Sequence, residues 1–164
     1  MLLGEWSKNE VILLCMIGLA IVIALLLPRK LTKEIAILSW LWGLASGLVF
    51  DFTIGGGIID FYTVNDSPHY ELFDGLYYVL FAPFGYFFIY FYEALHISKY
   101  TFIYYILTWT LIGMGMNWVF ITSDIIAFQN EFTIIYSFSV FLLIQTITAL
   151  AYEQLKKVRQ YMAT

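Results

Sequence analysis

The chain has 164 residues, of which 62% are hydrophobic, 20% aromatic and only 12% charged. Because a membrane-spanning helix needs about 20 mostly apolar residues, the apolar residues suffice for about five such helices. The charged fraction is about half that of a typical soluble domain, which excludes a soluble catalytic domain. The net charge of −4 and the small number of basic residues argue against nucleic acid as a partner.

Five apolar runs without polar alternation predict transmembrane helices rather than the strands of a barrel. They span residues 11–27, 35–54, 72–92, 102–122 and 132–152. The expected fold is an all-α bundle of five transmembrane helices, in a single domain that covers residues 1–164. The tail is expected to continue the fifth helix, with Glu153 and Lys157 paired one turn apart.

Basic residues flank the runs unevenly. Seven of the eight lie in the linker 28–34, in the linker 93–101 and in the C-terminal tail, whereas Lys8 lies on the other side. Since Lys and Arg favour cytoplasmic segments, this predicts an outer N-terminus and a cytoplasmic C-terminus. Three basic residues of the tail are expected to contact anionic lipid headgroups. They are Lys156, Lys157 and Arg159.

Small residues recur at helical spacing and predict close helix packing. Ser39, Gly43 and Gly47 stand at successive steps of four in the second run, so they share one face, which ends in Asp51. Small side chains on such a face let two helix backbones approach closely. The residues expected to pack helices in this way are Ser39, Gly43, Gly47, Gly85 and Gly113.

Polar residues inside the runs could meet in one outward-facing pocket. Asp51 ends the packing face of the second run, and a carboxylate in hydrocarbon normally faces the bundle interior. Asp74 and Tyr78 share a face of the third run, and Asn117 lies in the fourth. At 1.5 Å of rise per residue, the two acids and Asn117 lie roughly 8–12 Å outward of the midplane. The alternative is that Asp51 is an interfacial acid beside a packing face.

The acidic connection between the second and third runs could bind a divalent cation, since carboxylates and imidazole are suitable ligands. Its candidate ligands are Asp60, Asp66, His69 and Glu71. Their spacing matches no dedicated metal loop, and the Asp-Ser-Pro segment at 66–68 also indicates an ordinary turn. A solvated acidic loop is therefore the alternative. Near the cytoplasmic end, Glu93 is expected to pair with a basic loop residue such as Lys99.

Three aromatic-rich stretches between Tyr70 and Glu153 carry a resemblance to known proteins. They are YELFDGLYYVLFAPFGYFFIYFYE, YYILTWTLIGMGMNW and YSFSVFLLIQTITALAYE. They resemble small multispan membrane proteins of Bacillus-like and clostridial bacteria that have no assigned function. The resemblance implies a bacterial plasma membrane, and it implies no activity and no functional residue.

These features favour a non-enzymatic membrane protein, namely a partner-binding, regulatory or accessory subunit. It is expected to act as a homo-oligomer or with another membrane protein, because packing faces are present and nucleotide and catalytic motifs are absent from the sequence. The alternative is a channel or transporter that uses the polar pocket for an ion or small solute. A third hypothesis is a membrane-embedded enzyme that modifies lipids, with paired acids as base and ligand.

Overall fold

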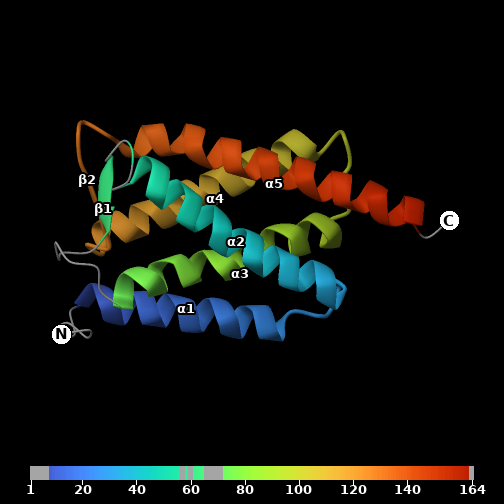
Figure 1. The fold of residues 1–164 in the computed structure, drawn as a ribbon, viewed down its shortest axis with the longest axis horizontal. Helices are drawn as coiled ribbons and strands as arrows, with labels where there is room; N and C mark the ends of the chain where they lie inside the picture. The colour runs from blue at the N-terminus through green and yellow to red at the C-terminus, as the bar shows by residue number, and fades with distance from the viewer. Residues whose placement is uncertain (1–7, 56–57, 59–60, 65–71, 163–164) are drawn as a thin grey trace.

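The computed structural model contains five long helices that run alternately up and down (Figure 1). It describes residues 8–55, 58, 61–64 and 72–162, with the backbone alone for residues 72–74. The helices are α1 (Lys8–Leu26), α2 (Lys33–Ile54), α3 (Leu72–Ala94), α4 (Phe102–Thr122) and α5 (Ile134–Met162). All five are long and apolar enough to cross a membrane. The expected all-α fold with five such helices is confirmed.

The helix ends depart from the expected spans where polar residues continue a helix. α1 begins at Lys8, three residues before the first apolar run, and its first turn contains the acidic residue Glu10. An acidic side chain is stabilised there by the positive end of the helix dipole. α5 continues through the polar tail to Met162, as expected. Its last turns extend beyond the other helices at the C-terminal end of the bundle (Figure 1).

α3 packs directly against α1 and α2, while α4 packs against α5. Two glycines face each other where α2 crosses α3. A Cβ on Gly43 would stand 2.3 Å from the carbonyl oxygen of Phe81, and a Cβ on Gly85 would stand 2.7 Å from Cα of Gly43. The two backbones are therefore in contact, which only small residues allow.

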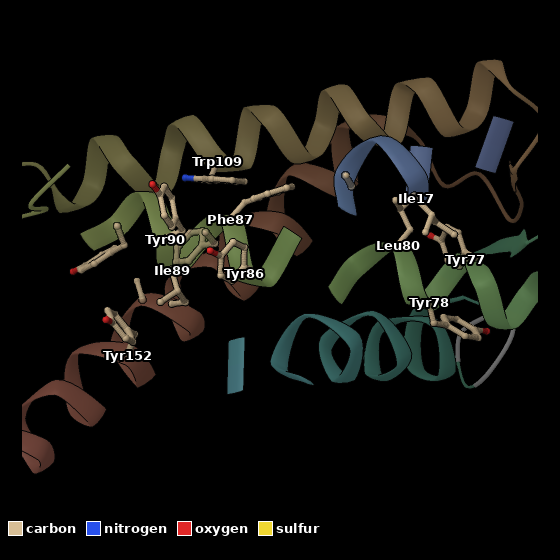
Figure 2. Packing of buried hydrophobic residues seen from close by; sticks show 14 of the residues in the cluster. Ile17, Tyr77, Tyr78, Leu80, Tyr86, Phe87, Ile89, Tyr90, Trp109 and Tyr152 are labelled. Atoms are coloured by element: carbon tan, nitrogen blue, oxygen red, sulfur yellow. The ribbon is translucent and has the colours of Figure 1, made fainter. Parts of the chain in front are cut away.

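α3 and α4 meet through aromatic rings instead. The ring of Phe88 lies 5.1 Å from that of Tyr105 and 5.6 Å from that of Trp109, measured between centroids. The hydroxyl of Tyr105 donates a hydrogen bond to the carbonyl of Phe88. Figure 2 shows Trp109 lying alongside the aromatic residues of α3. Since rings hold these two helices apart, the α4–α5 pair is separated from the α1–α3 group by side chains.

Two short strands, which the sequence did not indicate, close one end of the bundle. β1 (Tyr62–Val64) and β2 (Ile126–Phe128) pair in antiparallel register, with Tyr62 opposite Phe128. The amide of Gln129 also donates to the carbonyl of Phe61 at 2.8 Å. The pair lies at the end of the bundle away from the C-terminus (Figure 1). It ties the α2–α3 connection to the α4–α5 connection.

Candidate functional site

A cavity of about 150 Å³ lies between α2, α3, α4 and α5. Its wall is mainly aromatic, and the rings include Trp42, Phe81, Phe88, Trp109 and Phe120. Among the described residues, none that lines it is charged. Ligand-binding pockets are usually concave, mostly apolar and lined with aromatic side chains, with a few polar groups that orient the ligand. The cavity has this composition.

The cavity lies between helices that glycine contacts and aromatic contacts hold at different spacings. Gly43 and Gly85 bring α2 onto α3, whereas the rings of α3 keep α4 away. Gly113 of α4 also lines the cavity, and a Cβ there would stand 2.7 Å from the ring of Phe141 on α5. The space left between the helix groups is closed at one end by residues of the β1–β2 pair, which include Tyr62 and Phe128.

Four polar side chains of α4 and α5 reach the cavity wall. The amide nitrogen of Asn117 donates to Ser137 Oγ at 2.8 Å, which links α4 to α5. Thr148 Oγ1 accepts a hydrogen bond of 2.8 Å from the indole nitrogen of Trp42, which links α5 to α2. Gln145 lines the cavity as well, and its amide makes no hydrogen bond with any described residue. An amide inside an apolar span without a partner is costly, so Gln145 is a candidate group for holding a ligand.

Asp51 lies close to the closed end of the cavity, in the last turn of α2. Its side chain is buried, and Oδ2 accepts a hydrogen bond of 2.5 Å from the hydroxyl of Tyr78. The other carboxylate oxygen, Oδ1, has no hydrogen-bond partner in the described part of the chain. Figure 2 shows Tyr78 projecting from α3 towards α2. Burial, and next the charge of Asp51, raise the pKa of the Tyr62 hydroxyl well above its usual range.

The structure brings together two of the four residues of the expected polar pocket. Asp51 and Tyr78 share a hydrogen bond. Asn117 instead pairs with Ser137 on the wall of the aromatic cavity. The side chain of Asp74 lies outside the described part of the structure. The Asp51–Tyr78 contact and the aromatic cavity are therefore two separate features that lie next to each other.

The proposed divalent-cation ligands of the acidic connection are Asp60, Asp66, His69 and Glu71. All four lie outside the described residues. Within residues 8–55, 58, 61–64 and 72–162, no three His, Cys, Asp or Glu residues are grouped as they would be around a metal ion.

Glu93 pairs with a different lysine from the one expected. Its carboxylate lies 2.9 Å from Nζ of Lys156 on α5, whereas Nζ of Lys99 lies over the ring of its neighbour Tyr100. The expectation was wrong because helical periodicity gives the face of a side chain and not which helix lies beside it. Lys156 also lies 3.7 Å from Glu153, so this lysine, rather than Lys157, is the one paired with Glu153.

The remaining basic residues of the tail are exposed. Lys157 makes no ion pair with a described residue, and Arg159 donates a hydrogen bond of 3.4 Å to Thr32. Sequence reasoning placed all three basic residues at the lipid headgroups. In the structure Lys156 is occupied by two carboxylates, which leaves Lys157 and Arg159 as the residues with exposed charge.

Two features of this region were missed from the sequence. Tyr62 was expected in a loop, and no pattern in the sequence predicted the cavity. A run of Trp, Gly, Ser and Gly at positions 42, 43, 46 and 47 puts the largest and smallest side chains near each other on α2. Such a mixture is a sign of uneven packing, although it does not identify the opposing helix.

No known protein family, curated protein or solved structure matches this chain.

Proposed function

We propose that this chain is a non-enzymatic membrane protein that binds a small, neutral, lipophilic molecule in the cavity between α2, α3, α4 and α5. The observation that carries this proposal is the cavity itself, which measures about 150 Å³ and has an uncharged, largely aromatic wall. An apolar protein cavity of about this size stays dry and accepts a molecule such as benzene. A single substituted ring is therefore the ligand size that fits.

The polar groups on the wall favour a ligand with one hydrogen-bonding substituent. Gln145 has an amide that can both donate and accept, and no described residue satisfies it. A hydroxyl or carbonyl group on the ligand would supply that partner. A ligand that lacks such a group would gain no hydrogen bond from Gln145.

The position of the cavity supports a regulatory or accessory role. A molecule bound there would touch both the α1–α3 group and the α4–α5 pair, whose mutual contacts are made by side chains. A ligand shifts an equilibrium between arrangements only when it binds one of them more tightly. The cavity lies where such a difference would arise, and the altered surface would act on a second copy or on another membrane protein.

We place the chain in a bacterial plasma membrane with the N-terminus outside. The α1–α2 connection, the α3–α4 connection and the C-terminus lie at one end of the bundle (Figure 1). Seven of the eight basic residues lie in or directly beside these segments, which favours a cytoplasmic position for that end. The five helices long and apolar enough to cross a membrane support the membrane location.

A matched pair of valine substitutions tests the proposal. Val140 lines the cavity, whereas Val49 is 59% exposed on the outer face of α2. The melting temperature of purified protein in detergent is measured with toluene, phenol and acetophenone. We expect phenol and acetophenone to raise it more than toluene does. Val140→Phe should abolish these shifts because the new ring fills the cavity, and Val49→Phe should keep them.

The control removes the main ambiguity, which is that lipophilic probes also enter the detergent. Such partitioning acts equally on both valine variants. If Val140→Phe retains the same shifts as the wild type, the probes bind elsewhere and the cavity is not a ligand site.

A further inference from the structure

Asp51 is the charged group that the cavity does not explain. It lies in a helix that is apolar enough to cross a membrane, and only 8% of its surface is exposed. An ionised carboxylate in such a place is rare and is normally paired. Asp51 forms no ion pair with any described residue. Among these residues, Tyr78 donates a hydrogen bond to the carboxylate and the hydroxyl of Tyr62 interacts with it, and both phenols are neutral.

The position of Asp51 along α2 also raises the free energy of its ionised carboxylate. The helix ends at Ile54, so the carboxylate lies in the last turn, beside the negative end of the helix dipole. Cations are stabilised at this end of a helix and anions are destabilised. A positive charge next to Asp51 would relieve both the burial of the carboxylate and its unfavourable position.

Two oxygens of Asp51 converge on one small region beside Gly55. The amide of Gly55 donates to the carbonyl of Phe50, so the carbonyl of Asp51 lacks its usual partner one turn later. A Cβ on Gly55 would stand 2.8 Å from that carbonyl oxygen and 2.8 Å from Asp51 Oδ1. The ring of Tyr62 borders the same space, with its Cε2 atom 3.0 Å from that Cβ position. Two oxygens of Asp51 therefore converge beside Gly55, where any side chain would collide with them.

We propose that Asp51 and the adjacent end of α2 form a binding site for a monovalent cation of the size of Na⁺. Oδ1 and the backbone carbonyl oxygen of Asp51 are its protein ligands, and water completes the shell. The single carboxylate supplies one negative charge, which matches one positive charge. A divalent ion would need more carboxylates, since Ca²⁺ takes six to eight oxygen ligands. This inference goes beyond ligand binding in the cavity and does not depend on it.

Thermal unfolding in defined salts tests the site. Purified protein in detergent is melted at increasing NaCl, with choline chloride added to keep the ionic strength constant. We expect the melting temperature of the wild type to rise by several degrees and then to saturate. Asp51→Asn should melt at a temperature that does not depend on Na⁺. Glu93→Gln, which removes a carboxylate at the other end of the bundle, should respond to Na⁺ as the wild type does.

A direct binding measurement covers the case in which Asp51→Asn fails to fold. Wild-type protein should bind ²²Na⁺ saturably, with one ion per chain. Gly55→Ala should lose at least tenfold in affinity, because its methyl group occupies the space beside both oxygens while the carboxylate stays in place.

Three results would overturn the proposal. The first is the absence of saturable ²²Na⁺ binding by the wild type, and the second is an equal Na⁺ response in the wild type and Asp51→Asn. The third is a melting temperature that depends on pH but not on Na⁺, because Asp51 would then bind a proton. The titratable groups that interact with Asp51 in the described structure are Tyr62, Tyr77 and Tyr78.

Discussion

The contact between Gly43 of α2 and the backbone of α3 should not tolerate even one methyl group. A Cβ at this position would lie 2.3 Å from the carbonyl oxygen of Phe81 and 2.9 Å from that of Ala82, whereas ordinary contact begins at 3.4 Å. The helices would have to separate by about 1 Å, and a gap of that size loses roughly a quarter to a half of the dispersion energy of each contact. Overpacking of this kind costs about 1–3 kcal/mol.

The control is an alanine at a glycine with open space. Gly115 of α4 has no atom within 4 Å of its Cβ position. Both substitutions gain about 1 kcal/mol of helix propensity, so this contribution cancels in the comparison. Gly43→Ala should therefore be less stable than Gly115→Ala by about 1–3 kcal/mol. On the scale of soluble proteins of this length, each kcal/mol lowers the melting temperature by about 2–4 °C.

The assay is thermal unfolding of both variants in the same detergent, followed by tryptophan fluorescence and checked for reversibility. Equal melting temperatures for the two alanine variants would refute the reasoning, since the steric effect at Gly43 would then be absent. The backbone contact between α2 and α3 would be wrong in that case. The aromatic cavity, one wall of which depends on this contact, would lose its structural basis.

Two further predictions concern topology and the C-terminal end of the bundle. A membrane-impermeant thiol reagent should label an engineered cysteine at Asn65 and should miss one at Gln160, because the basic residues favour a cytoplasmic C-terminus. The opposite labelling pattern would contradict the charge-bias argument. The pair Glu93–Lys156 should show a coupling energy of about 0.5–1 kcal/mol in a double-mutant cycle with glutamine substitutions, and the coupling should weaken in salt. As the control, Lys157→Gln, at an exposed lysine without an ion pair to a described residue, should leave stability unchanged. A coupling energy of similar size between Glu93 and Lys157 would refute the pairing of Glu93 with Lys156.

The helices could be predicted from the sequence because hydrophobicity is a local property. A run of 17–21 apolar residues must satisfy its backbone groups within itself, which only a helix allows. α4 begins and ends where the apolar run from 102 to 122 does. The start of α1 could not be found in this way, since polar residues extend a helix without changing its apolar run. The extension of α5 was expected from its polar tail and not from its apolar run.

Contacts between distant segments could not be predicted, because they depend on which helices are neighbours. The pairing of Tyr62 with Phe128 joins two connections separated by more than sixty residues, and neither three-residue strand has a pattern of its own. The lysine partner of Glu93 was misassigned for the same reason. The periodicity of α2 placed Gly43 and Gly47 on one face, but it could not distinguish their neighbours. Gly43 meets backbone, whereas Gly47 meets the ring of Phe81.

Differences in the spacing between helices explain why the candidate site lies where it does. In the interior of a lipid bilayer, helices are held together by packing and hydrogen bonds, because burial of apolar surface gives no advantage over lipid. Glycine contacts therefore fix α2 on α3 closely, while the bulky rings of Phe88 and Trp109 set a wider spacing for α4. A hydrogen bond from Trp42 to Thr148 spans that wider spacing and holds α5 to α2. The cavity is thus a consequence of side-chain sizes that the sequence specifies.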